Sequence, residues 1–166
     1  MAELVESGVD RPKLEESRRA LNKMPPDILR YKGRLIERTE LELGGKIAIV
    51  TIPQSEISQY SPLYNPAPLI QGDLLMTRGV YVSIVLKSYD NGRITAAIRC
   101  NPPAAIAAAL ANHFTGGGHA YAAGFKLQDS RGLTEVKAEC LRYASELLST
   151  ITLKDPTDET VQYTFA

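Results

Sequence analysis

The sequence predicts an α/β fold with a mixed β-sheet, a hairpin, helices packed on the faces of the sheet and a helical segment before it. Two runs rich in β-branched residues, 80–89 and 93–100, are joined by Asp-Asn-Gly, a strong hairpin signal. Residues 132–151 show a helical apolar period, and residues 101–114 are rich in alanine. Hydrophobic residues make up 44% of the 166 positions, enough for a packed core.

Two helices are expected at the start of the chain. Asp10 can cap the first, which carries Pro12 near its first turn, and Met-Pro-Pro at 24–26 breaks it. The second begins at Asp27 and runs through "DILRYKGRLIERTEL". Its apolar spacing predicts four buried positions, Ile28, Tyr31, Leu35 and Ile36.

The central part of the sequence predicts a strand, a variable segment and a helix before the hairpin. A glycine turn and a β-branched run over 44–53 indicate a strand that ends at Pro53. Residues 54–65 are irregular or a short helix, and residues 67–79 form a helix closed by Gly79. The first hairpin strand is almost continuously apolar, which indicates a central position buried on both faces.

The C-terminal part predicts a helix, a strand and a second helix. Asn101 is the expected cap of a helix over 101–114 with prolines at its start, and the glycines that follow end it. Residues 122–128 predict a strand, and Thr134 caps or opens the amphipathic helix over 132–151. The final "VQYTFA" indicates an edge strand or a loose tail.

The composition limits the classes of function. Nineteen basic and nineteen acidic residues give a net charge of zero, so no bulk attraction to nucleic acid is expected, although a local phosphate pocket is compatible. Cys100 and Cys140 lack metal-type spacing and are expected to be reduced, buried thiols. No apolar run is long enough to span a bilayer and no signal peptide pattern is present, so we expect no membrane association and a cytoplasmic location.

The stretch "HFTGGGHAYAAGF", residues 113–125, has two interpretations. Gly116 to Gly118 can form a helix C-cap and turn, with Gly116 in the left-handed conformation. Alternatively, the glycines expose backbone N–H groups to an anion, beside His119 and the guanidinium of Arg99. The pattern favours the cap for Gly116 and leaves His119 open. It does not show whether Arg99 and the glycines converge.

The same stretch resembles the GGGH-x-x-AAG motif in the C-terminal DHH-associated domain of the DHH-type phosphoesterases. "GRITAAIRCN" is similar to the strand that carries the Arg-Ser element of that family, and the likeness runs over about 45–150. Two residues depart from the family pattern: Cys100 stands where the family has serine, and Thr115 where a fourth glycine is frequent. Both departures bear on which substrate the domain would bind.

The resemblance implies a substrate-binding module that closes over a two-metal centre, with Mn or Mg held by a separate catalytic domain. Known members of the group include nano-RNases, 3′-phosphoadenosine 5′-phosphate phosphatases and RecJ-like exonucleases. The expected partner is therefore a short single-stranded nucleic acid or a nucleotide phosphate. Arg99 would pair with a phosphate, His119 would donate to it or contact a base, and the glycines would present N–H groups. Asn101 would add a contact or only cap its helix.

The Asp-His-His triplet of the catalytic domain is missing from this sequence, which has only two histidines, His113 and His119. We therefore expect no catalytic residue, no metal ligand and no hydrolysis by this chain alone. We interpret 1–44 as a helical connector to a missing catalytic domain, 45–150 as the substrate-binding domain and 151–166 as a tail. A naturally short stand-alone module is the alternative.

Three neighbouring residue assignments follow from the same stretch. His113 is expected to be structural. Tyr121 either stacks on a base or is a partly buried core residue. The small residues 122–124 would let the loop pack closely against the sheet.

Two other functions compete with phosphate binding in an incomplete phosphoesterase. One is a non-catalytic module that binds structured RNA or forms a homodimer, and the zero net charge counts against broad RNA binding. The other is an independent hydrolase with His119 as general base, which lacks an accompanying nucleophile or metal cluster.

Overall fold

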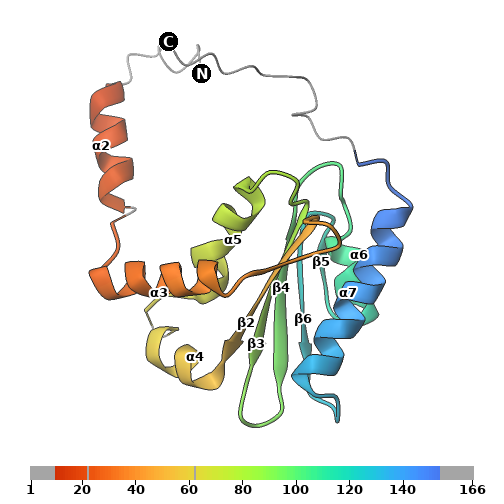
Figure 1. Cartoon of the computed structure of the whole chain (residues 1–166). Coiled ribbons are helices and arrows are strands. Elements are labelled where there is room, and N and C mark those ends of the chain that lie inside the picture. Colours follow the sequence, from red (N-terminus) through yellow and green to blue (C-terminus); the bar gives the residue numbers. More distant parts are fainter. Residues whose placement is uncertain (1–9, 22, 62, 154–166) are drawn as a thin grey trace. The chain divides into compact units, whose positions relative to one another are not determined.

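The computed structural model describes residues 10–21, 23–61 and 63–153 (Figure 1). The chain divides into two compact units, Met1–Tyr31 and Lys32–Ala166. In the first unit, α2 (Arg11–Leu21) is capped as predicted, because the Lys13 amide donates to Asp10 Oδ1 at 3.3 Å. Helix α3 (Pro26–Glu37) begins in this unit and ends in the second.

The second unit is built on a six-stranded sheet with the order β1-β2-β3-β4-β6-β5. Strands β2 and β3 pair in parallel and every other pair is antiparallel, so the sheet is mixed, as predicted. The strands are β1 (Glu40–Glu42), β2 (Ile47–Pro53), β3 (Val82–Ser88), β4 (Ile94–Cys100), β5 (Gly117–His119) and β6 (Ala122–Leu127).

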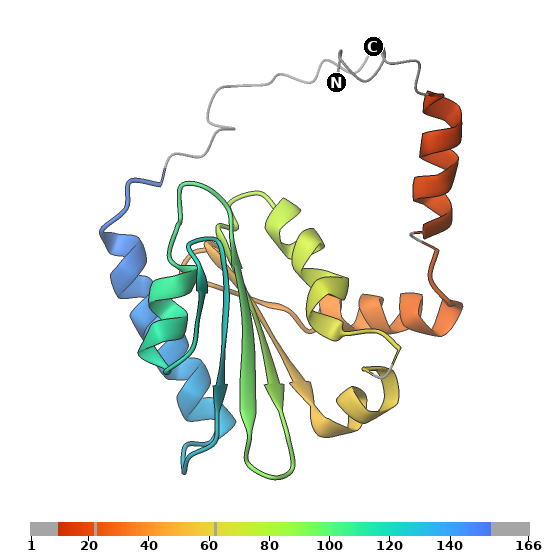
Figure 2. The same cartoon turned by 180° about the vertical axis from the view of Figure 1, so that it is seen from behind.

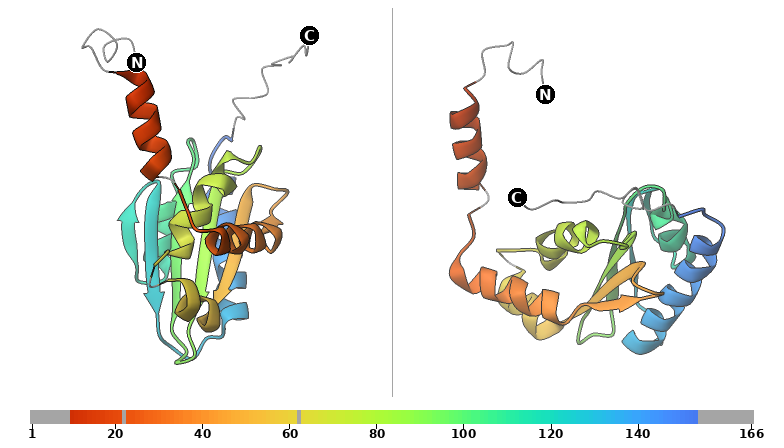
Figure 3. Two further views of the ribbon diagram at one scale, coloured as in Figure 1. Left: turned by 90° about the vertical axis from the view of Figure 1, so that its left-hand side faces the viewer. Right: turned by 45° about the horizontal axis from the view of Figure 1, so that its top comes forward.

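Helices cover both faces of this sheet (Figures 1 and 2). On one face lie α6 (Ala107–His113) and α7 (Leu133–Ser149), and the main hydrophobic core fills the space between them and the sheet. On the other face, α4 (Gln54–Tyr60) packs on β2 and β3, and α5 (Pro66–Met76) packs on β2, β3 and β4. Strands β6 and β5 lie outside this footprint, and their α5-side face is open in the left view of Figure 3.

The predicted hairpin is confirmed. Strands β3 and β4 pair over their full length, and Gly92 in the connecting turn has a φ of 79°. The apolar first strand is central, since β3 lies between β2 and β4 and its first five residues are buried.

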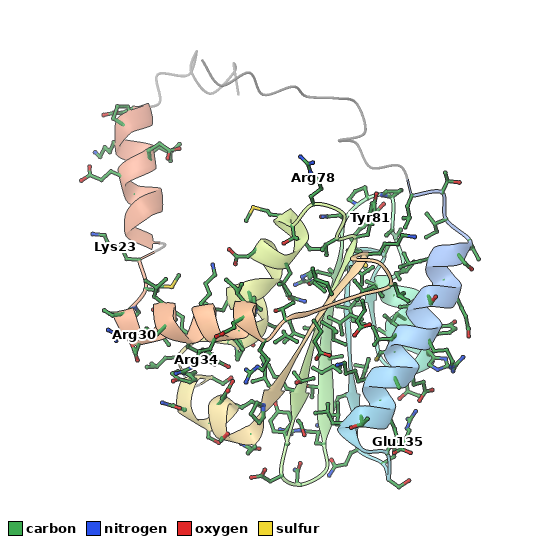
Figure 4. The ribbon with its side chains drawn as sticks, viewed as in Figure 1. Lys23, Arg30, Arg34, Arg78, Tyr81 and Glu135 are labelled. Atoms are coloured by element: carbon green, nitrogen blue, oxygen red, sulfur yellow. The ribbon has the colours of Figure 1, made fainter. Side chains whose placement is uncertain are left out.

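Side-chain bonds join the second half of α3 to α4 within the second unit. Arg34 Nη2 donates to Tyr60 Oη at 2.6 Å, and Figure 4 shows Arg34 between the two helices. Arg38 makes a bidentate pair with Glu56, at 2.8 and 2.6 Å. Of the predicted buried residues of α3, Ile28, Tyr31 and Leu35 are buried, whereas Ile36 is 47% exposed and that prediction is wrong.

Other expectations need correction at element ends. Helix α6 begins at Ala107 and not at Asn101, because consecutive prolines disfavour helical conformation in the residues before them. Of the two alternatives for Thr134, the first-turn position in α7 is confirmed, since Gly132 is the N-cap and its backbone N–H donates to Glu135 Oε2 at 2.9 Å. The short strands β1 and β5 were not expected from the sequence, and the tail 161–166 lies outside the described residues.

Among the residues that the structure describes, no helix has the length and apolar character needed to cross a membrane.

Candidate functional site

The strand register brings Arg99 and His119 to one row on the open face of the sheet. Arg99 on β4 pairs with Ala122 on β6, and Ala122 pairs with His119 on β5. Directly opposite residues in antiparallel strands point to the same face, so the side chains of Arg99 and His119 flank Ala122 on the side of α5. Two strand spacings separate their backbones, about 10 Å. The sheet thus joins two residues that are 20 positions apart in sequence.

The neighbouring row is made of small residues. Ala97 on β4 pairs with Gly124 on β6, and Gly124 pairs with Gly117 on β5. Beside Arg99 and His119, the sheet therefore offers a floor of backbone and methyl groups that a ligand can approach closely.

The strand positions on the α5 side include basic residues and no acidic ones. Four basic or titratable side chains lie on this face of the strands: Lys87, Arg99, Lys126 and His119. No acidic residue of the strands lies on it. Lys87 Nζ is 2.7 Å from Asn65 Oδ1, and burial lowers the pKa of Lys87 against an opposing effect of Tyr89. A chain without net charge therefore still has a local surface suited to an anion.

Arg99 and His119 are both exposed, and neither has a hydrogen bond or ion pair within the described part of the chain. This separates Arg99 from Arg131, Arg142 and Arg93. Arg131 and Arg142 pair with carboxylates, and the guanidinium of Arg93 lies 3.8 Å from the centroid of the Tyr89 ring. An arginine without an internal partner on an open face is available to a ligand.

The three glycines of the run differ in what they contact. A Cβ on Gly116 would overlap the carbonyl oxygen of Gly124 and lie 2.5 Å from Phe125 Cβ. Gly118 has a φ of 144°, and a Cβ there would lie 2.5 Å from Ala123 Cα. At Gly117 the nearest atom would be Asn112 Oδ1 at 3.8 Å, in open space. Close packing on β6 therefore explains Gly116 and Gly118, whereas a side chain at Gly117 would meet no packing constraint.

The end of α6 also differs from the expected cap. The left-handed residue is Thr115, with a φ of 57°, and not Gly116. The Gly116 amide donates to the Ala111 carbonyl at 2.8 Å, which is a bond at the helix end. The resemblance implied that all three glycines present free N–H groups, but that of Gly116 is already bonded within the chain. We assign Gly116 a structural role.

Asn101 acts as a bridge at the end of β4. Its side-chain Nδ2 donates to the Leu75 carbonyl at 2.7 Å, and its backbone N–H donates to the Tyr81 carbonyl at 2.8 Å. These bonds tie Asn101, which directly follows the end of β4, to the end of α5 and the start of β3. Asn101 therefore supports the strand that carries Arg99 and does not cap α6.

His113 lies on the opposite face, in a network with α7. Its Nε2 is 2.8 Å from Glu139 Oε1, and its ring stacks on Tyr143 with centroids 4.2 Å apart. The hydrogen bond to His113, with further help from Arg131, holds the pKa of Glu139 below its usual value. His113 is structural, as predicted.

The remaining reactive groups do not form a second centre on this face. Cys100 and Cys140 are buried free thiols, as expected, and burial raises their pKa values to about 11 and about 12. Tyr121 is 42% exposed, which contradicts a core position. Within residues 10–21, 23–61 and 63–153, no three His, Cys, Asp or Glu side chains gather as a metal site would require.

A hollow of about 480 Å³ lies beside Arg99, between α5 and β4. Sequence reasoning did not identify it. The only signal was Gly72, an isolated glycine in a predicted helix. The lining residues are Asn65, Ala67, Pro68, Gln71, Gly72, Leu75, Ala97 and Arg99.

No protein-family model and no curated protein sequence matches this chain. Among solved structures, it is similar to an exopolyphosphatase-related protein from Bacteroides fragilis, with a TM-score of 0.69 and 21% identity. That alignment covers 89% of this chain and 43% of the other protein.

Two further solved structures match less well. One is a pGpG-specific phosphodiesterase, PggH, from a Vibrio species (TM-score 0.47, 10% identity, 73% of this chain and 38% of that one). The other is an uncharacterized protein from Helicobacter pylori G27 (TM-score 0.40, 15% identity, 72% and 31%). The chain therefore spans less than half the length of each of these proteins, and it shares its fold with a part of the first.

Proposed function

We propose that this chain is the phosphate-binding module of a phosphoesterase that acts on short oligonucleotides or nucleotide phosphates, and that it binds phosphate through Arg99 and His119. The observation that carries the proposal is the row Arg99–Ala122–His119: two exposed side chains with no partner among the described residues, on an acid-free face of the sheet. Phosphate oxygens accept hydrogen bonds, and both side chains can donate them.

Each residue of the row has a distinct part in this proposal. The planar fork of Arg99 would make two parallel hydrogen bonds to one phosphate group, which Lys cannot reproduce. His119 would donate from one ring nitrogen to another phosphate oxygen. Gly117 and Ala122, which have little or no side chain, would let the phosphate approach the sheet between them.

The fold of the exopolyphosphatase-related protein supports a role with phosphate substrates. Because the chain aligns with 43% of that protein, we propose that catalysis belongs to a separate domain with bound Mn or Mg and that this module holds the substrate. We further propose that residues 1–44 connect the two domains and that 45–150 form the module.

The experiment is a titration of the ¹⁵N-labelled chain with 3′-phosphoadenosine 5′-phosphate and with a dinucleotide, followed by NMR. Arg99→Ala and His119→Ala should each weaken binding, Arg99→Ala by about tenfold or more, since charge-assisted hydrogen bonds contribute about 1.5–3 kcal/mol. Arg142→Ala is the matched control, because Arg142 is exposed on α7, on the opposite face, and pairs with Glu146 at 2.7 Å. Equal affinities of wild type and Arg99→Ala would refute the proposal.

A further inference from the structure

The hollow between α5 and β4 has features that the fold alone does not require. Its volume of about 480 Å³ is within the range of about 300–1,000 Å³ typical of small-molecule sites. Its walls include apolar groups of Ala67, Pro68, Leu75 and Ala97. Arg99, the proposed phosphate-binding residue, lines the same hollow.

Gly72 is the first such feature. It lies within α5, where glycine costs about 1 kcal/mol relative to alanine. A Cβ at this position would meet no atom within 4 Å, and its φ is not in the left-handed region. Neither packing nor backbone geometry therefore calls for glycine, and the missing side chain keeps the wall of the hollow open.

Gln71 is the second feature. The residue is only 5% exposed, and its Nε2 donates to the Ala97 carbonyl at 3.0 Å. A carbonyl oxygen only accepts, so this bond fixes which end of the amide faces β4. Its Oε1 has no hydrogen-bond partner in the described residues, and Gln71 lines the hollow. An anchored acceptor is thus available to an N–H group of a ligand.

We infer that this hollow is a nucleobase subsite, in which the base of a bound nucleotide packs on Pro68 and Leu75 and donates an N–H to Gln71 Oε1. The inference rests on the proposed function, because Arg99 would hold the phosphate of the same nucleotide at the mouth of the hollow. A nucleobase fits this chemistry: it is planar and apolar on its faces, has N–H donors on its edge and is joined to a phosphate through a sugar. Gly72 then provides the space for the base.

The test compares adenosine 5′-monophosphate with ribose 5-phosphate, which lacks the base, on the full chain. Wild type should bind the nucleotide about tenfold more tightly, a ratio that corresponds to about 1.4 kcal/mol. Gly72→Leu should fill the hollow and reduce this ratio to about one, while ribose 5-phosphate binds as in wild type. Arg99→Ala should weaken both ligands.

Gly33→Leu is the matched control. Gly33 lies inside α3, is exposed and also has no atom within 4 Å of its Cβ position, but it does not line the hollow. Both leucine variants gain helix propensity, so thermal unfolding should show both folded and no less stable than wild type. Gly33→Leu should leave the affinity ratio unchanged.

The possible failures are distinguishable. If wild type binds both ligands equally and Arg99→Ala weakens both, the phosphate site stands and the base subsite is wrong. The same conclusion follows if Gly72→Leu leaves the affinity ratio at its wild-type value. If neither ligand shows Arg99-dependent binding, the proposed function fails and the subsite fails with it.

Discussion

Alanine at Gly116 and at Gly117 should differ strongly in its effect on stability, although the two residues are adjacent. At Gly116 the new methyl group would overlap the Gly124 carbonyl oxygen and lie 2.5 Å from Phe125 Cβ and 2.8 Å from Phe125 Cα. These atoms belong to β6, which is paired on both sides and cannot shift without loss of ladder hydrogen bonds. Overpacking costs about 1–3 kcal/mol of stability. Because the neighbouring atoms cannot move away, Gly116→Ala should lower the free energy of unfolding by about 3 kcal/mol.

At Gly117 the methyl group would face open space, 3.8 Å from Asn112 Oδ1. Gly117→Ala should therefore change the free energy of unfolding by less than about 0.5 kcal/mol. The fold should tolerate this methyl group, because no backbone atom lies within 4 Å of it.

Urea unfolding measures both effects. The chain has no tryptophan, so circular dichroism is the suitable signal. With a slope of about 2 kcal/mol per molar urea, Gly116→Ala should lower the midpoint by about 1.5 M. Gly117→Ala should leave it almost unchanged. Equal losses in the two variants, or a larger loss for Gly117→Ala, would refute the assignment of Gly116 to close packing and Gly117 to open space.

Three further predictions concern stability. Ser83 is fully buried and its Oγ has no hydrogen-bond partner in the described residues, so Ser83→Ala should raise the free energy of unfolding by about 1 kcal/mol; a clear loss in urea unfolding would show that the hydroxyl is satisfied. Burial raises the pKa of Cys140 to about 12, so above about pH 9 the unfolded state loses its thiol proton and the folded state keeps it. Stability should then fall with rising pH by up to about 1.4 kcal/mol per unit from this thiol, and Cys140→Ala should remove that slope. The pKa of Glu139 is lowered in the folded state, so this group stabilises the fold above the usual carboxyl range, and that stabilisation is lost as the pH falls. His113→Ala removes the main cause of the lowered pKa and should therefore make the free energy of unfolding less sensitive to acid. An unchanged acid profile would contradict this.

The sequence was sufficient for features that depend on local chemistry. The Asp-Asn-Gly turn predicted the β3–β4 hairpin, and the apolar run predicted the central position of β3. Asp10 predicted the start of α2, since a side-chain cap needs only residues close in sequence.

Features that depend on tertiary contacts were less accessible. Alanine content predicted a helix from Asn101, but the two prolines and the bonds from Asn101 to Leu75 and Tyr81 hold this segment out of the helix. The convergence of Arg99 and His119 depends on β6 pairing between β4 and β5, and no local pattern specifies that register. The hollow beside α5 was missed for the same reason, since its two walls come from distant segments.

The central claim is that Arg99 binds phosphate, and the most direct measurement follows its own side chain. The Arg99 Nε–H resonance, assigned through its loss in Arg99→Lys, would be recorded in ¹⁵N-labelled chain during titration with 3′-phosphoadenosine 5′-phosphate. We predict a saturable downfield shift of that proton, with the same midpoint as the backbone shifts of Gly117 and His119. An Arg99 resonance that stays fixed while the ligand saturates other residues would contradict the account.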